Sequence, residues 1–92
     1  MKITYTPAKR ETTLIDRGID FDDAVEVFAS KTFDRPDNRH DYGEDRIISV
    51  GYLRKRMVVV VWTLRGAARH IISMRKANDR EQARFGKQLG EN

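Results

Sequence analysis

The 92-residue sequence has no cysteine, only two prolines and no long apolar segment. Without cysteine there is no disulfide framework or thiolate metal site, so the hydrophobic core has to support the fold alone. The longest apolar run, residues 57–62, is far shorter than the ~20 residues that a membrane-spanning helix needs. The N-terminus also lacks a signal-peptide pattern. We therefore expect a cytoplasmic protein without membrane contact, built as one small domain over residues 1–92.

Acidic residues are absent between Arg46 and Asn78, a stretch that carries eight Lys or Arg residues. Eleven of the fourteen acids lie instead between Glu11 and Asp45. The formal net charge of +4 therefore understates how basic the second half is. Such a block attracts polyanions such as nucleic acid, although a solvated basic face explains the same charge count equally well.

The motifs of several enzyme classes are also missing. The sequence has no Gly-rich phosphate loop, HExxH helix, Cys/His cluster or Gly-x-Ser-x-Gly elbow, which argues against nucleoside-triphosphate and zinc chemistry. The side chains of Asp37, His40, Asp41 and Glu44 could bind a divalent metal, but surface acids in a loop with proline and glycine are more often only hydrophilic. We expect no metal site and no cofactor.

The N-terminal region predicts a first helix after a short extended start at residues 2–5. Thr6 followed by Pro7 is typical of an N-cap with proline at the first helical position, and Gly18 is suited to the left-handed residue that ends a helix. We expect Leu14 and Ile15 to be its buried residues.

A second helix is predicted to begin at Asp20, with Asp23 as a partner in an arrangement like a capping box. Acids in a first turn complement the helix dipole, which explains this acidic cluster better than a metal site does. Spacing of i, i+3, i+4 and i+7 predicts the inward residues, which are Phe21, Ala24, Val25 and Phe28.

The remaining chain predicts a loop or edge strand at 33–44, then strands at 46–53, 57–64 and 69–76. The connector 54–56 suits a hairpin, and the valine-rich second strand suits the centre of a sheet, covered on both faces. A last helix should start near Asp79 with an Asn78–Glu81 capping box and direct Phe85 and Leu89 inward. The fold class is α+β, with two N-terminal helices, an antiparallel sheet of three to four strands and a C-terminal helix.

The third strand carries the residues of greatest functional interest. Alternation with a period of two predicts that Arg69, Ser73 and Arg75 share one face, with Arg65 at its edge. His70 would lie on the opposite, apolar side as a packed histidine. Guanidinium groups bind phosphate oxygens bidentately, so this row predicts a positive platform for a nucleic-acid backbone.

The same platform would suit cleavage of RNA. When a ribose 2′-hydroxyl attacks its own phosphodiester, the phosphorane gains negative charge that fixed cations stabilise. Arginine does not lose its proton, so the base must be another group. The candidates are Glu44, His40, Lys76, Lys9, and the RNA and solvent themselves. Simpler roles are open too: Arg75 and Lys76 would only solvate a strand end, and Glu44 would only pair with Arg46 or Arg69.

Three segments resemble the BrnT family, the toxin half of BrnT/BrnA type II toxin-antitoxin pairs. They are 5-YTPAKRETTLIDRGIDFDDAVEVF-28, 37-DNRHDYGEDRIISVG-51 and 69-RHIISMRKANDRE-81, whose order and spacing match the family's pattern. The chain departs from it at Tyr5-Thr6, where Trp-Asp is common, and at Thr13, Arg17 and Phe85, where Asn, His and Tyr are frequent.

The resemblance implies a RelE-like fold and a ribonuclease toxin that arrests translation until an antitoxin blocks it. It also implies a BrnA-like partner that binds DNA and forms a hetero-oligomer with this chain. It implies an active surface of Glu44, Arg46, Arg65, Arg75 and Lys76, with Lys9 and Arg69 as weaker, RNA-binding members. We expect a metal-independent endoribonuclease, and the alternative is a non-catalytic basic domain that binds nucleic acid or regulates. A module that only binds protein is a third possibility.

Overall fold

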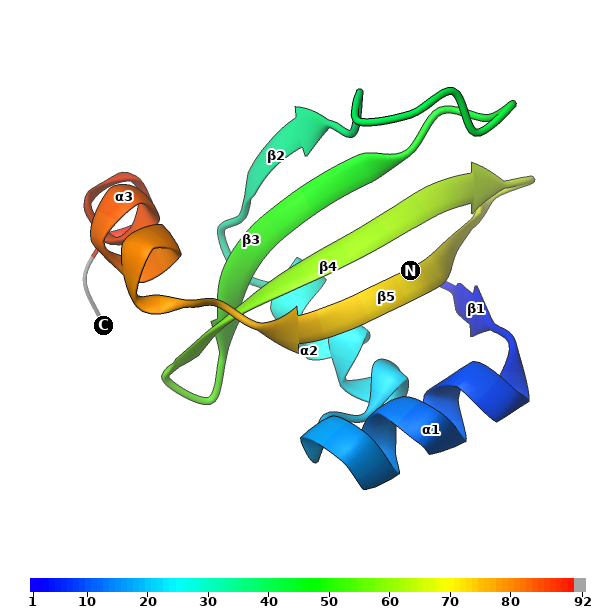
Figure 1. Ribbon diagram of the computed structural model, residues 1–92, viewed down its shortest axis with the longest axis horizontal. Helices are drawn as coiled ribbons and strands as arrows, with labels where there is room; N and C mark the ends of the chain where they lie inside the picture. Colours follow the sequence, from blue (N-terminus) through cyan, green and yellow to red (C-terminus); the bar gives the residue numbers. More distant parts are fainter. Residues whose placement is uncertain (91–92) are drawn as a thin grey trace.

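The computed structural model describes residues 1–90 as an α+β fold around a five-stranded sheet of order β1-β5-β4-β3-β2 (Figure 1). The strands are β1 (Ile3–Tyr5), β2 (Phe33–Pro36), β3 (Ile47–Leu53), β4 (Arg56–Arg65) and β5 (Ala68–Lys76). The helices are α1 (Pro7–Arg17), the 3-10 helix η1 (Phe21–Asp23), α2 (Ala24–Phe28) and α3 (Asp79–Leu89). The predicted fold class is confirmed, but the prediction that a helix comes first and that the sheet is purely antiparallel is wrong.

The difference comes from the two edges of the sheet. The extended start of the chain becomes β1, which pairs in parallel with β5, Thr4 opposite His70. At the other edge, β2 pairs antiparallel with β3. The sheet is therefore mixed, and it is wider than the three or four strands expected, because residues 3–5 and 33–36 each extend it at one edge.

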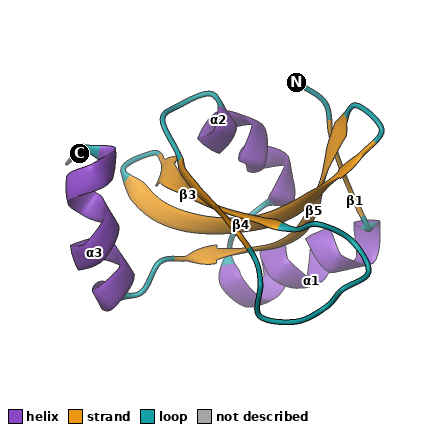
Figure 2. Cartoon of the chain, turned by 90° about the horizontal axis from the view of Figure 1, so that it is seen from above, coloured by secondary structure: helices purple, strands orange, loops and turns teal. Residues whose placement is uncertain are grey.

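Strand β4 is the central strand, as its valine run predicts. It lies between β5 and β3, and every residue from 57 to 63 is buried. Both faces of the sheet are covered, α2 lying on one side and α3 at one end of the other (Figure 2). A strand covered on both faces needs apolar residues at successive positions, not alternate ones.

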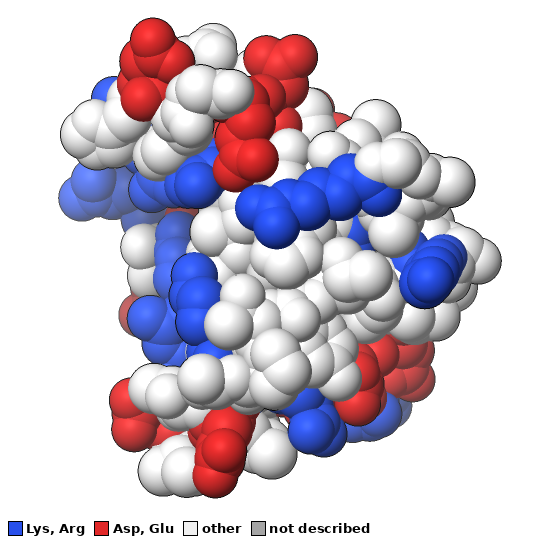
Figure 3. Space-filling view, turned by 90° about the vertical axis from the view of Figure 1, so that its right-hand side faces the viewer, with Lys and Arg blue, Asp and Glu red and all other residues white. Residues whose placement is uncertain are grey.

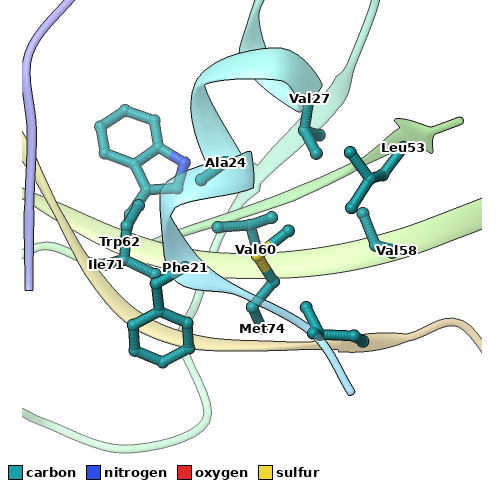
Figure 4. Close-up of a cluster of buried hydrophobic side chains, with 10 residues drawn as sticks. Phe21, Ala24, Val27, Leu53, Val58, Val60, Trp62, Ile71 and Met74 are labelled. Atoms are coloured by element: carbon teal, nitrogen blue, oxygen red, sulfur yellow. The ribbon is translucent and has the colours of Figure 1, made fainter. Parts of the chain in front are cut away.

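The face under η1 and α2, which we call the α2 face, holds the larger core. It joins Phe21, Ala24 and Val27 to Val58, Val60, Trp62, Ile71 and Met74 (Figure 4). On the opposite side, the α3 face, Phe85 and Leu89 of α3 pack on Ile48, Val50, Val59 and Val61. The predicted capping box is present, with Asn78 accepting a hydrogen bond from the Glu81 amide and Glu81 accepting one from the Asn78 amide.

Helix α1 has the predicted ends but not the predicted buried side. It begins at Pro7 and ends before Gly18, which has φ 66°. Leu14 and Ile15 are 41% and 74% exposed, so the prediction that they are buried is wrong. The α2 face is already covered by residues of η1 and α2, and α1 has no buried residue.

The second helix begins with a tighter turn than expected. The Asp20 side chain accepts a hydrogen bond from the Asp22 amide, and the capping-box-like pairing with Asp23 does not form. Because a 3-10 turn has three residues per turn, Phe21, Ala24 and Val27 share the inward side, each 0% exposed. The predicted core residue Val25 is 43% exposed, which corrects that prediction.

Candidate active site

A β-bulge in β5 decides which of its side chains share a face. Val61 pairs with Ser73 and Trp62 pairs with Ile71, so Ile72 is an extra residue on β5. One extra residue shifts the alternation of side chains by one position. Arg69 therefore lies on the α2 face with Ile71, whereas Ser73 and Arg75 lie on the α3 face. The predicted row of Arg69, Ser73 and Arg75 is wrong.

The surroundings of Arg69 give its guanidinium a packing role. Its Cζ lies 4.3 Å from the ring centroid of Trp62 and 4.5 Å from that of Phe28. Cation–π contacts of this kind are favourable with Trp in particular. The positive charge of Arg69 is thus stacked on aromatic rings of the α2 face, on the other side of the sheet from Arg65 and Arg75.

Lys76 is also separated from Arg75, its neighbour in sequence. Arg75 pairs with Val59 and Lys76 with Val58, and these two valines belong to opposite cores. Lys76 is exposed on the α2 side at the end of β5. The structure therefore does not bring Lys76 together with the arginines of the α3 face.

Glu44 is the centre of a polar cluster on the α3 face, where the 37–46 loop meets the end of β4. Its Oε2 accepts a hydrogen bond from Arg46 Nε at 3.1 Å, and its Oε1 lies 3.8 Å from Arg65 Nη2. The Arg46 guanidinium also stacks on the Tyr42 ring at 3.9 Å. Glu44 comes from the 37–46 loop and Arg65 from the end of β4, so three of the predicted site residues meet here.

Arg75 lies at the other end of the same face, beside the start of α3. Its guanidinium donates two hydrogen bonds to Glu81, at 2.8 and 2.9 Å. These bonds raise the pKa of Arg75 and lower that of Glu81 to about 2. Sequence reasoning assigned Glu81 only to the helix cap, because a contact between a strand end and the next helix is not visible in local spacing.

His70 of β5 lies on the same face as the polar cluster around Glu44 and Arg65. It is paired with Thr4 on one side and Thr63 on the other, and its Nδ1 lies 2.9 Å from Thr4 Oγ1. Burial lowers the pKa of His70, with further lowering by Arg65 and Lys9 and an opposing effect of Glu44. The prediction of a packed histidine on the side opposite Arg75 is wrong, because the bulge places His70 on the α3 face with Arg65 and Arg75.

Lys9 reaches the same region from α1, since its charge acts on His70. Figure 3 faces the end of the molecule that holds β1 and the β4–β5 turn, and Lys and Arg side chains gather along its left-hand edge with acids above and below.

The α3 face carries two basic centres at its opposite ends. One is the Glu44 cluster, which we define as Glu44, Arg46, Arg65 and His70 with Lys9 nearby, and the other is Arg75.

The carboxylates of Asp37, Asp41 and Glu44 in the 37–46 loop accept hydrogen bonds within the protein. Asp37, whose side chain is 0% exposed, accepts hydrogen bonds from Arg39, which lower its pKa to about 2.

Among residues 1–90, no three His, Asp or Glu side chains gather closely enough to hold a metal ion. None of the helices in that range is long and apolar enough to cross a membrane.

A family described as the ribonuclease toxin BrnT of type II toxin-antitoxin systems matches residues 5–81. That range begins at the end of β1 and extends to Glu81, and it includes every member of the Glu44 cluster as well as Arg75. A search of curated proteins gave no match.

Proposed function

The chain belongs to the BrnT family of ribonuclease toxins of type II toxin-antitoxin systems, and from this premise we propose that its α3 face binds and cleaves RNA. The proposed reaction is attack by a ribose 2′-hydroxyl on the adjacent phosphodiester. Cleavage of RNA in this way would arrest translation in the cytoplasm. The whole chain would act as one toxin domain.

The observation that carries the proposal is the pair of basic centres on one sheet face. Arg46 and Arg65 lie at the Glu44 cluster, and Arg75 lies beside α3 on the same face. Their guanidinium groups present fork-shaped donors that match phosphate oxygens. Two centres at opposite ends of one face suit phosphates several nucleotides apart on a single RNA strand, one of them at the scissile bond.

Glu44 would act as a positioning residue within this site. Its carboxylate accepts a hydrogen bond from Arg46 and approaches Arg65 at 3.8 Å, so it holds two guanidinium groups near each other. Donors held in place before the reaction stabilise a developing oxyanion without reorganisation. The arginines would thus supply the charge stabilisation that other nucleases take from a divalent ion, and we propose a metal-independent reaction.

Lys9 would be a further RNA contact at the Glu44 cluster, because α1 brings its charge close to His70. We leave Arg69 and Lys76 out of the proposed catalytic group. Arg69 is stacked on Trp62 and Phe28, and Lys76 follows the bulged strand onto the α2 side. Arg69 was expected on this face because regular alternation was assumed for β5, and Lys76 was expected in the site from the family resemblance.

We further propose that a BrnA-like antitoxin, itself DNA-binding, forms a hetero-oligomer with this chain and blocks cleavage. The family description implies an antitoxin partner. A segment rich in acidic residues would match the charge of the α3 face. The pair would then bind DNA through the antitoxin, while the toxin chain contributes the RNA-cleaving face.

The test is an RNA cleavage assay in the presence of a chelator, with the purified chain alone and with translating ribosomes. Wild type is expected to cut RNA, whereas Arg65→Ala is expected to lose most of that activity with unchanged circular dichroism. Arg56→Ala is the matched control, since Arg56 is exposed on β4 beside Leu53 and away from the α3 face. Intact RNA retained by wild type under both conditions would support the non-catalytic nucleic-acid-binding alternative.

A further inference from the structure

His70 has one ring nitrogen held and the other free. Nδ1 lies 2.9 Å from the Thr4 hydroxyl, and among residues 1–90 no hydrogen-bond partner is found for Nε2. The fully buried polar side-chain atoms without a partner in that range consist of Arg35 Nε alone, so His70 Nε2 is not fully buried. A ring oriented through one nitrogen with the other free is the arrangement that general acid–base catalysis requires.

Charged groups from three elements face this ring. Arg65 comes from β4, Glu44 from the 37–46 loop and Lys9 from α1, while Thr4 of β1 is neutral. Burial of the imidazole lowers the pKa of His70, and Arg65 and Lys9 lower it further against the opposing effect of Glu44. The ring is therefore neutral near pH 7, the state in which Nε2 can accept a proton when Nδ1–H donates to Thr4.

The other candidate bases are less well situated. Glu44 is occupied by Arg46 and Arg65. His40 lies in the loop, with its ring 5.7 Å from that of Tyr42. Lys76 is on the opposite side of the sheet from the Glu44 cluster. His70 has a ring nitrogen without a hydrogen-bond partner among residues 1–90, and it lies next to Arg65 on the α3 face, since Thr63 pairs with His70 and Arg65 with Ala68.

We propose that His70 is the general base of the RNA cleavage reaction and that Thr4 positions its ring, an inference that rests on the proposed function. His70 Nε2 takes the proton of the ribose 2′-hydroxyl as the 2′ oxygen bonds to phosphorus. The bond between phosphorus and the 5′ oxygen breaks, and that oxygen takes a proton from Lys9 or water. The products are a 2′,3′-cyclic phosphate and a 5′-hydroxyl end, and the imidazolium proton passes through water to Lys9, or to the hydroxide left when water is the donor, which restores the starting state.

The experiment measures kcat/KM for a short RNA across pH 5 to 9 with wild type, His70→Asn, Thr4→Val, Arg65→Ala and the control Arg56→Ala. Asparagine can keep a hydrogen bond to Thr4 but cannot accept the proton. We expect His70→Asn to lower kcat/KM by roughly 10²–10⁴-fold, to remove the rising acidic limb of the profile, and to leave binding of a non-cleavable 2′-deoxy strand unchanged. Thr4→Val should shift that limb, which a merely structural threonine would not do.

Two further measurements address the ring itself. The protein has only two histidines, so nitrogen NMR can report the tautomer and pKa of His70 separately. We expect a proton on Nδ1 and a pKa below the ordinary value, both altered in Thr4→Val. Added imidazole should restore part of the activity of His70→Gly, whether or not His70→Asn folds well.

The outcomes separate the two proposals. If Arg65→Ala loses cleavage while His70→Asn retains the wild-type rate and pH profile, RNA cleavage stands and the role of His70 is overturned. Failure of imidazole to rescue a folded His70→Gly also counts against it. If wild type cuts no RNA, even with translating ribosomes, the proposed function is overturned and the role of His70 with it.

Discussion

The guanidinium of Arg75 donates two hydrogen bonds to the carboxylate of Glu81, at 2.8 and 2.9 Å. The same carboxylate accepts the Asn78 amide at 2.9 Å, completing the cap of α3. Hydrogen bonding by Arg75 is the main cause that lowers the pKa of Glu81 to about 2, against the opposing effect of burial. One carboxylate thus fixes both the start of a helix and the direction of a proposed phosphate-binding side chain.

Replacing Glu81 by glutamine separates these two roles. Glutamine can still complete a capping box, but it removes the charge that holds Arg75. We expect Glu81→Gln to reduce RNA cleavage by up to roughly tenfold through misplacement of Arg75, and to lower the melting temperature because the charge that pairs with Arg75 is lost. Glu81→Ala should in addition lose about 1 kcal/mol of stability with the cap. Equal cleavage by Glu81→Gln and wild type would mean that Arg75 needs no fixed direction.

Acid should destabilise the protein through its paired carboxyls. The folded pKa values of Asp37 and Glu81 are about 2, below their ordinary values of 3.8 and 4.5. The stability that these two ionised carboxylates give the folded state is fully present above their ordinary pKa values. It is lost as pH falls towards 2, because in that range the unfolded state binds more protons than the folded state. Because Arg39 is 64% exposed, we expect only about 1–2 kcal/mol from Asp37.

Denaturant unfolding at several pH values between 5 and 2 checks this expectation. Asp37→Asn should be less stable than wild type at pH 6, and the two should converge as pH approaches 2. Parallel curves over the whole range would show that Asp37 does not contribute through its charge.

Arg69 should matter for stability and not for RNA cleavage. Its stack on Trp62 and Phe28 is expected to contribute about 0.5–2 kcal/mol, which Arg69→Ala would lose together with the contact of its alkyl stem. Chemical denaturation gives the stability, and kcat/KM is corrected for the folded fraction. A large loss of activity per folded molecule would show that the α2 face also contacts RNA.

The β3–β4 turn stores backbone strain that glycine would relieve. Arg54 and Lys55 have φ values of 48° and 71°, a region that residues with a side chain rarely adopt. We expect Lys55→Gly to raise the free energy of unfolding by about 0.5–1 kcal/mol after the greater entropy of the unfolded glycine is counted. Arg54→Gly is the informative control, because Arg54 also pairs with Asp23 and Glu26, and it should gain less or lose stability.

Gly51 of β3 is expected to tolerate no side chain. An added Cβ would lie 3.0 Å from both Thr32 Cγ2 and Val27 Cγ1, closer than ordinary carbon–carbon contacts. We predict that Gly51→Ala destabilises the fold by about 1–3 kcal/mol, measured by thermal or urea unfolding. Gly86→Ala is the matched comparison, since nothing lies within 4 Å of the added Cβ there.

Much of the fold was predictable from local signals. Thr6-Pro7 and Gly18 mark the ends of α1, and Asn78 with Glu81 marks the start of α3, because caps depend on residues within one turn. The unbroken apolar stretch of β4 identifies a strand buried on both faces. By contrast, the prediction that Val25 faces the core was wrong. The 3-10 turn that opens the second helix sets which residues face inward, and that turn depends on how Phe21 enters the core.

The candidate site was only partly predictable. Glu44, Arg46 and Arg65 do come together, as the family resemblance implied, and Arg75 shares their face. His70 was assigned to packing and Arg69 to the predicted row because alternation was counted through Ile72 as if β5 were regular. Lys76 was assigned to the site from the family resemblance, and the structure places it on the α2 side.

The amino-acid sequence by itself therefore determined the fold class, the helix ends, the central strand and the basic character of the second half. These follow from spacing, capping and charge, which act between residues close in the chain. Only the tertiary structure decided which charges share a face, that β1 pairs with β5, and that Thr4 holds His70. A bulge and an edge pairing arise from the match between strands that are distant in sequence, so no local pattern specifies them.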